Sequence, residues 1–351
     1  ICSIRCAEAG WLRRTPDRTL SLRLPTGLLT SRMESLLSNF ASPVVLSFAL
    51  GVAAQLLRSD LEIPRPIYRG LSVYLLLAIG LKGGVELSKT SLDLFLAPAG
   101  VTLLLGMLTP LTAFAVLRWL GRLDMVNSAA IAAHYGSVSA VTFIAAVSYM
   151  QTLGGETEGF MPTLVAILEV PGIVVALLIP HFGSRGNVSI GKALREVLTG
   201  SSIVLLLGGL TIGFVAGPEK FAPVSPFFVN GFQGALVLFL LELGMVTARR
   251  LRDLRRVGGF LVAFGVVVPV LHGAVAVAAG HWAGLSVGGT AVLAAMVSSG
   301  SYIAAPAAVR IALPSANPTY YLTASLGITF PFNITLGIPL YAHMAGWLAG
   351  G

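Results

Sequence analysis

The sequence predicts an all-α integral membrane protein with ten transmembrane helices, arranged as two inverted five-helix repeats with broken helices at spans four and nine. Three observations predict this fold. The chain is 55% apolar and 11% charged, with a mean hydropathy of +0.85, whereas soluble domains carry roughly 25% charged residues. Apolar segments long enough to cross a bilayer recur from end to end. Matching motifs also recur in the two halves, in the same order.

Hydropathy divides the apolar sequence into ten candidate spans separated by short polar connections. The expected spans are 42–57, 68–85, 95–118, 127–150, 160–182, 201–217, 230–248, 258–280, 286–308 and 319–348.

Basic residues gather in the loops that follow odd-numbered spans. They are Arg58, Arg65, Arg69, Arg118, Arg122, Arg185, Lys192, Arg195, Arg249, Arg250, Arg252, Arg255, Arg256 and Arg310. The opposite loops carry Lys89 and Lys220. Short loops rich in Lys and Arg stay in the cytoplasm. We therefore expect cytoplasmic basic loops, both termini outside, and a bacterial inner (plasma) membrane location.

The first segment, residues 1–32, is rich in arginine and differs in composition from the remainder. We expect it to be a leader or a non-native segment. The remaining chain divides into a first five-span repeat (33–183), a cytoplasmic connecting loop (184–200) and a second, inverted five-span repeat (201–351). Because much of the net charge of +8 lies in the first segment, the charge does not indicate a nucleic-acid partner.

The repeat is visible in three pairs of motifs at a nearly constant offset. Residues 106–110 match 265–269 (G-x-x-x-P), residues 163–171 match 323–331 (T-x₇-P), and residues 132–139 match 294–301. Each half has an odd number of spans, so the second copy must lie upside down relative to the first. Inverted repeats of this kind are typical of secondary transporters.

Small and hydroxylated residues interrupt spans four and nine, in AAHYGSVSAVTF (132–143) and AAMVSSGSYIAA (294–305). Unwound backbone is costly against lipid and is tolerated where it lines a cavity. The two breaks are therefore expected to meet near the middle of the bilayer. Helix N-termini there would attract an anion, and carbonyl and hydroxyl oxygens would bind a small cation.

Polar and small residues of both breaks are the expected substrate-binding groups. They are Gly136, Ser137, Ser139, Thr142, Ser298, Ser299, Ser301 and Tyr302. The alternative is that these small residues only allow helices to approach closely. That packing role is the one we expect for Gly209, Gly213 and Gly217 in span six.

Glu169 is an acid within a span, next to Pro171. Such acids commonly mark ion or proton sites. The expected sodium ligands are Glu169, Ser139, Ser301, Thr329 and Asn333. Alternatively, Glu169 carries a proton or forms a structural hydrogen bond.

Four further polar residues within spans are expected to have gating or structural roles: His134, Lys82, Glu86 and Glu242. Lys82 and Glu86 lie four residues apart, so they can face each other on one side of a helix.

From about Ser42 to its end, the chain resembles the sodium-dependent bicarbonate transporter family first known from cyanobacteria. The resemblance rests on GLKGG (80–84), YGSVSA (135–140), EVP (169–171) and SSGSYIAAPAAVRIALPSANP (298–318). It implies two inverted five-span repeats, a homotrimer, and a substrate site between two broken helices. For cyanobacterial members it also implies a small PII-like regulatory protein on the cytoplasmic face. The chain differs from the cyanobacterial pattern at Tyr302, where that pattern has an aspartate.

The sequence therefore predicts a secondary active transporter that takes up a small anion, bicarbonate first, by sodium symport with alternating access. Sodium is the coupling ion and membrane lipid surrounds the protein, with no other cofactor expected. The alternatives are a carrier for another organic anion, or a proton-coupled antiporter that uses Glu169. We do not expect an enzyme, because the acids within the spans (Glu86, Glu169, Glu242) form no paired catalytic set and no HExxH motif occurs.

Overall fold

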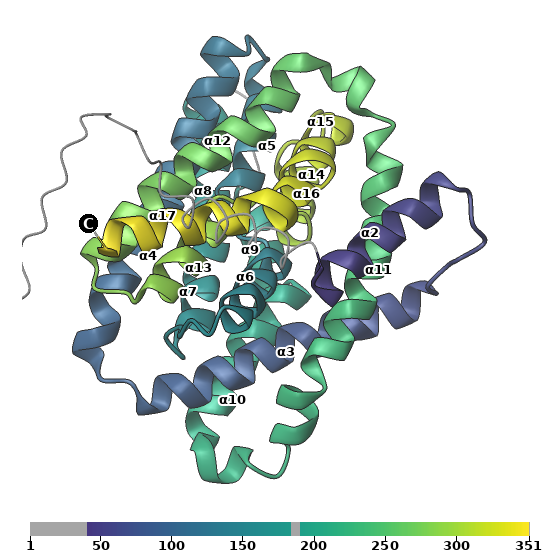
Figure 1. The fold of residues 1–351 in the computed structure, drawn as a ribbon. Coiled ribbons are helices and arrows are strands. Elements are labelled where there is room, and N and C mark those ends of the chain that lie inside the picture. Colours follow the sequence, from purple (N-terminus) through teal and green to yellow (C-terminus); the bar gives the residue numbers. More distant parts are fainter. Residues whose placement is uncertain (1–40, 184–189, 351) are drawn as a thin grey trace, which may run out of the picture.

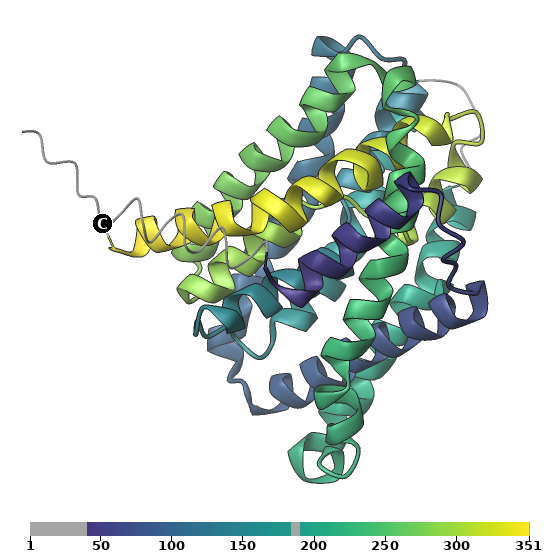
Figure 2. The same ribbon diagram turned by 45° about the vertical axis from the view of Figure 1, so that its right-hand side comes forward.

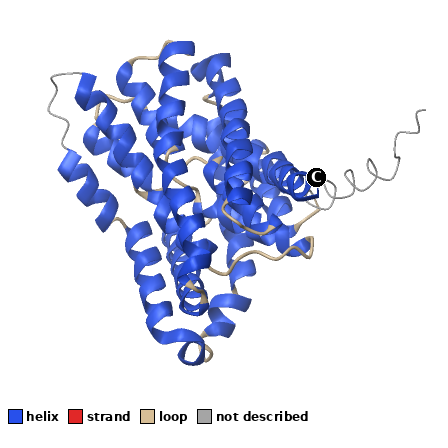
Figure 3. Ribbon diagram, turned by 90° about the vertical axis from the view of Figure 1, so that its left-hand side faces the viewer, coloured by secondary structure: helices blue, strands red, loops and turns tan. Residues whose placement is uncertain are grey.

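The computed structural model describes residues 41–183 and 190–350, and these residues form helices and connections without a strand (Figures 1 and 3). The expected leader, residues 1–32, lies outside the described residues. The α-helices of the first half are α2 (Pro43–Leu56), α3 (Arg65–Lys89), α4 (Leu92–Ala115), α5 (Met125–Tyr135), α6 (Ala140–Thr152), α7 (Met161–Glu169) and α8 (Pro171–Gly183). Those of the second half are α9 (Ile190–Thr199), α10 (Ser201–Phe221), α11 (Phe232–Leu251), α12 (Leu254–Trp282), α13 (Val287–Val297), α14 (Ala304–Ala312), α15 (Pro318–Leu322), α16 (Phe330–Phe332) and α17 (Ile338–Gly350). Short π-helical segments, η1 (Val116–Leu120), η2 (Pro226–Asn230), η3 (Thr323–Thr329) and η4 (Asn333–Gly337), extend or join them.

Eight helical segments of the described chain are long and apolar enough to cross a membrane, and α2 and α13 are shorter apolar helices. An integral membrane protein is therefore confirmed. The expected spans fall on these segments, but α2 has 14 residues, fewer than the roughly 20 that a perpendicular crossing needs. The expected ninth span contains two short helices, α13 and α14.

Two pairs of helices cross closely at glycines and form a four-helix group of α2, α3, α10 and α11 (Figures 1 and 2). In one pair, a Cβ added at Gly80 of α3 would lie 3.0 Å from the Cα of Gly209 in α10. In the other pair, a Cβ added at Gly244 of α11 would lie 3.1 Å from the Cα of Gly51 in α2. The missing side chains let the backbones approach, as in other membrane helix pairs.

The glycine run of span six has two different roles. Gly209 and Gly213 both face α3 at close range, so the packing prediction is confirmed for them. For Gly217 it is wrong: this residue has a φ of 64°, lies at a kink before Pro218, and has no neighbour within 4 Å of an added Cβ. Glycine adopts positive φ without the steric cost of a Cβ.

The remaining spans pack into a second group that contains the interrupted helices α5–α6 and α13–α14 (Figure 1). In this group α4 contacts α5, α7 and α8, while α12 and α17 both contact α13. The two groups meet where α3 and α10 contact α7, and where α11 contacts η3.

The expected connecting loop 184–200 contains a helix, α9, between Ile190 and Thr199. Ala193 and Val197 are buried while Lys192, Arg195 and Glu196 are exposed, which is the pattern of an amphipathic surface helix. The helix packs against α14. The connecting segment is therefore helical over residues 190–199, and residues 184–189 lie outside the described chain.

Candidate functional site

The two interrupted helices meet at their breaks. In span four the helix stops at Tyr135 and resumes at Ala140. In span nine it stops at Val297 and resumes at Ala304. These interruptions coincide with the polar stretches that the sequence singled out.

Hydrogen bonds join the breaks directly. The backbone N–H of Ser301 donates to the carbonyl of His134 at 2.7 Å. The backbone N–H of Ser139 donates to the Ser299 hydroxyl at 2.8 Å, and the Ser139 hydroxyl donates to the Tyr302 hydroxyl at 3.4 Å. Freed backbone groups of one break are thus satisfied by the other, as buried polar groups require.

Two serines occupy matching places at the starts of the second half-helices. The Ser139 hydroxyl accepts a hydrogen bond from Thr142 N at 3.2 Å and caps α6. The Ser301 hydroxyl accepts from Ala305 N at 3.4 Å at the start of α14. Each helix N-terminus carries partial positive charge, so the crossover has two positive helix ends near its hydroxyl groups.

A small cavity lies beside the crossover. It is lined by Leu76, Val138, Ser139, Ala140, Glu169, Ser202, Ser301, Tyr302 and Ile303. Its volume is about 10 Å³, close to what one water-sized sphere occupies. The cavity can therefore hold one small ion or one water, and not a larger substrate, in this arrangement.

Glu169 supplies the only carboxylate among the lining residues. It ends α7, directly before the interruption that leads to Pro171, and its side chain is 5% exposed. Within the described residues, no hydrogen bond or ion pair reaches this carboxylate. A buried charge without a partner is strongly unfavourable, so this group needs a bound cation or a proton. With the hydroxyls of Ser139 and Ser301, it offers the oxygen ligands that hard cations prefer.

Two predicted sodium ligands lie elsewhere. The Thr329 hydroxyl donates to the Gly265 carbonyl at 2.6 Å and is 2.6 Å from the Tyr135 hydroxyl. The Asn333 amide donates to the Ser298 carbonyl at 3.0 Å. Both side chains are fully buried, and neither lines the cavity with Glu169.

The other predicted substrate-binding residues surround the breaks without lining the cavity. Gly136 packs against Gly172, where an added Cβ would lie 2.9 Å from the Gly172 backbone. The hydroxyls of Ser137 and Thr142 are buried and have no hydrogen-bond partner among the described residues. The Ser298 hydroxyl donates back to the Ala295 carbonyl at 3.2 Å.

His134 is fully buried in the last turn of α5, next to the break. Its Nδ1 lies 2.7 Å from the Ala130 carbonyl, and its ring stacks on Tyr321 with centroids 4.5 Å apart. Its Nε2 has no partner among the described residues. Its carbonyl, which accepts from Ser301, is the part that touches the site.

The charged residues of the spans have partners that differ from the predicted pairing. Glu86 forms an ion pair with Lys89 at 3.0 Å, and Lys82 forms none in the described chain. Glu242 pairs with Arg249 at 3.2 Å. The expected pairing of Lys82 with Glu86 is therefore wrong. Lys89 lies one helical turn beyond Glu86, close enough for this contact.

Sequence reasoning missed Leu76 and Ser202. Through these two residues the four-helix group forms part of the cavity wall. Leu76 belongs to α3 and Ser202 is the second residue of α10. No local signal marks either residue, because a leucine and a serine are ordinary in membrane helices. Only the packing of the two groups places them beside Glu169.

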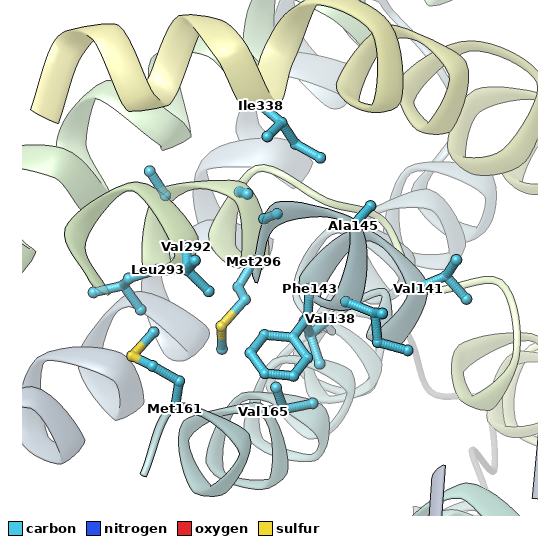
Figure 4. Close-up of a cluster of buried hydrophobic side chains, with 14 of the residues drawn as sticks. Val138, Val141, Phe143, Ala145, Met161, Val165, Val292, Leu293, Met296 and Ile338 are labelled. Carbon is cyan, nitrogen blue, oxygen red and sulfur yellow. The ribbon is translucent and has the colours of Figure 1, made fainter. Parts of the chain in front are cut away.

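Apolar side chains support the crossover from one side (Figure 4). Val138 and Val141 lie at the break, next to Phe143 of α6, Val165 of α7 and Met296 of α13. This cluster is buried, so it holds the breaks in place and keeps water away from that wall of the cavity.

Replacing Ser299 by alanine is expected to weaken the crossover, because the Ser139 N–H would lose its acceptor. The expected loss of unfolding free energy is about 1–3 kcal/mol for a buried donor left without a partner. Ser325→Ala is the matched control, because that serine is also buried and its hydroxyl donates to the Tyr321 carbonyl one turn earlier. Thermal unfolding in detergent measures both. Equal melting temperatures for the two variants would contradict the role of Ser299.

A family model described as the Na⁺-dependent bicarbonate transporter superfamily matches residues 43–346. The match covers most of the chain, so the chain belongs to that superfamily. Membership in a transporter family implies a transporter and not an enzyme. No curated protein matches the chain.

Proposed function

We propose that this member of the Na⁺-dependent bicarbonate transporter superfamily is a secondary transporter that takes up bicarbonate together with sodium by alternating access. The observation that carries the proposal is the Glu169 carboxylate, which has no partner within the described residues and lines a small cavity at two helix N-termini. A carboxylate with serine hydroxyls suits sodium, and positive helix ends suit an anion. Both co-substrates thus find complementary groups at one crossover.

Sodium binds in the small cavity, with Glu169, Ser139 and Ser301 as ligands. The Ser202 hydroxyl is a fourth candidate from the facing helix. Thr329 and Asn333 act from outside the cavity, since their side chains hold Tyr135 and Ser298 in place. A single water-sized space matches a dehydrated sodium ion, which is no larger than water.

Bicarbonate binds at the starts of α6 and α14, where Ser139 contacts Ser299 and Tyr302. The other proposed binding residues are Gly136, Ser137, Thr142, Ser298 and Ser301. Bicarbonate has four heavy atoms, so the cavity must widen to admit it. Leu76 and Ser202 form the wall that belongs to the four-helix group. Movement of the other group against this wall would open the site to either side, which is alternating access between rigid bodies.

The inverted repeat is supported by matched contacts. Span one packs on span seven (α2 on α11), and span six packs on span two (α10 on α3), both through glycines. In the repeat, span one corresponds to span six and span seven to span two. Exchanging the two halves therefore turns one of these helix pairs into the other. Ser139 and Ser301 likewise serve equivalent half-helices.

The basic loops face the cytoplasm in this proposal, and both termini lie outside. The exposed Lys192 and Arg195 on α9 would then meet anionic lipid headgroups. A homotrimer and a PII-like regulatory protein remain predictions from the resemblance. The bacterial inner-membrane location remains a prediction from the sequence.

The test is uptake of radiolabelled bicarbonate into proteoliposomes that contain the wild-type chain. An inward sodium gradient is expected to drive saturable uptake at least about tenfold faster than the same gradient made with choline. A tenfold ratio corresponds to a coupling free energy of about 1.4 kcal/mol between sodium and bicarbonate. Uptake driven by a pH gradient without sodium would instead favour proton coupling through Glu169. Folded protein without bicarbonate uptake under either gradient would overturn the substrate assignment and direct the search to other organic anions.

A further inference from the structure

The structure contains a second, larger cavity of about 520 Å³, which we call the vestibule. It is lined by residues of α3, α6, α7, η2 and α11 and by residues 155–159. Its polar lining includes Lys82, Glu86, Ser148, Gln151, Glu158 and Gln233. Its size is within the range of small-molecule sites.

The vestibule continues the small cavity along two helices. On α3, Leu76 lines the small cavity, while Ile79 lines the vestibule one turn later. On α6, Ser139 lines the small cavity, and Phe143 lines the vestibule one turn later. One helical turn is about 5.4 Å, so the linings of the two cavities lie about one turn apart on these helices.

Lys82 is the unpaired cation of this space. It is exposed, it lines the vestibule, and it forms no ion pair within the described residues. Three carboxylates share this lining, and the exposed Glu156 forms no ion pair within the described residues. The other two have partners. Glu86 pairs with Lys89 at 3.0 Å, and Glu158 accepts a hydrogen bond from Ser286 N at 2.5 Å, at the start of α13.

Neutral donors lie in the same lining. Gln233 accepts a hydrogen bond from Ser148 at 3.4 Å through its amide oxygen, which leaves its NH₂ group to donate. Gln151 adds a second amide. An ammonium group with neutral amide donors is a suitable set for a small oxyanion, and the ammonium is a point charge that does not require a fixed ligand geometry.

We propose that Lys82 binds a small oxyanion in the vestibule and forms an outer capture site, one step before the crossover. The inference rests on the proposed function for the identity of the anion, bicarbonate. It goes beyond that function because it assigns a second, separate binding site. Lys82 attracts the anion and repels sodium, so the two co-substrates depend on it in opposite ways.

The first test measures initial uptake rates against bicarbonate and against sodium for Lys82→Gln. The KM for bicarbonate is expected to rise about three- to tenfold, as loss of a nearby unit charge predicts, while the sodium KM stays equal or falls. Lys82→Arg should restore the bicarbonate KM. Lys220→Gln is the matched control, because it removes one cation from a helix parallel to α3 without touching the vestibule. A parallel rise in both KM values in Lys82→Gln would indicate a structural role and overturn the proposal.

The second test does not depend on transport. Beyond Cys2 and Cys6 the chain has no cysteine, so Ser148→Cys in a Cys2→Ser, Cys6→Ser background places one reactive thiol in the vestibule. With Lys82 present, a negatively charged methanethiosulfonate is expected to label it faster than a positively charged one, and Lys82→Gln should remove this difference. Bicarbonate should slow the labelling only when Lys82 is present.

The labelling result separates the two proposals. If the wild-type chain transports no bicarbonate, the proposed function fails, yet charge-selective labelling that depends on Lys82 still supports an oxyanion site. If the proteins with Lys82 and with Lys82→Gln show the same preference between the two reagents, the capture site is overturned. This holds even if uptake is sodium-dependent.

Discussion

Glu169→Gln is expected to abolish sodium-driven uptake. Glutamine keeps the size of the side chain and removes the charge. In the wild type, the carboxylate lines a water-sized cavity and has no protein partner in the described chain. Its neutralisation removes the one full negative charge from the lining, so a sodium ion there would keep only dipoles as ligands. Leaving one member of a buried charge pair uncompensated costs about 3–5 kcal/mol, enough to lower uptake at least a hundredfold.

A binding measurement should accompany the uptake assay. Sodium that binds the folded chain raises its melting temperature by mass action. We expect sodium, relative to choline, to stabilise the wild type and to leave Glu169→Gln unchanged. Glu169→Asp keeps the carboxylate on a side chain that is one methylene shorter. This variant should retain part of the sodium-driven uptake and part of the stabilisation by sodium.

Glu219→Gln is the matched control for loss of a carboxylate, because Glu219 is exposed on α10 and lines neither cavity. Its uptake and its response to sodium should equal those of the wild type. If Glu169→Gln kept sodium-driven uptake and sodium stabilisation, Glu169 would have a structural role and the proposed ion site would be wrong.

Gly172→Ala is expected to have the largest effect on stability. Gly172 is the second residue of α8, just after the interruption at Val170. It lies against the break of span four, where an added Cβ would collide with the Gly136 carbonyl. The colliding atoms belong to the backbone, so no side-chain rotation relieves the contact. Overpacking of this kind costs about 1–3 kcal/mol or more, and the shift would also displace Ser139.

The measurement is thermal unfolding in detergent together with uptake in proteoliposomes. We expect a lower melting temperature and reduced uptake for Gly172→Ala. Gly208→Ala is the matched control, because an added Cβ there has no neighbour within 4 Å. Alanine should be neutral or slightly stabilising at that position in a helix. Equal melting temperatures for the two variants would show that the break tolerates a larger residue at position 172.

The sequence by itself determined the class of the protein and the location of its breaks. Hydropathy identified the apolar segments, since a bilayer requires runs of apolar residues that no soluble fold needs. The stretches around Ser139 and Ser301 were recognisable because hydroxyl and glycine residues are costly in the middle of a span. Glu169 stood out for the same reason, as an acid beside a proline.

The sequence could not determine which of these residues share a cavity. Thr329 and Asn333 had the right chemistry and the expected repeat positions, but their side chains bond to Gly265 and Ser298 instead. Lys82 and Glu86 had helical spacing, yet Glu86 pairs with Lys89. Such outcomes depend on rotamers and on neighbouring helices, which local spacing does not specify.

Only the tertiary structure brought Leu76 and Ser202 to the site and opened the vestibule beside it. Both result from contact between helices that are far apart in the sequence. A span's apolar composition is the same whether it faces lipid, a neighbouring helix or a cavity. The sequence therefore determines that the helices cross the membrane, and their packing determines which polar groups meet.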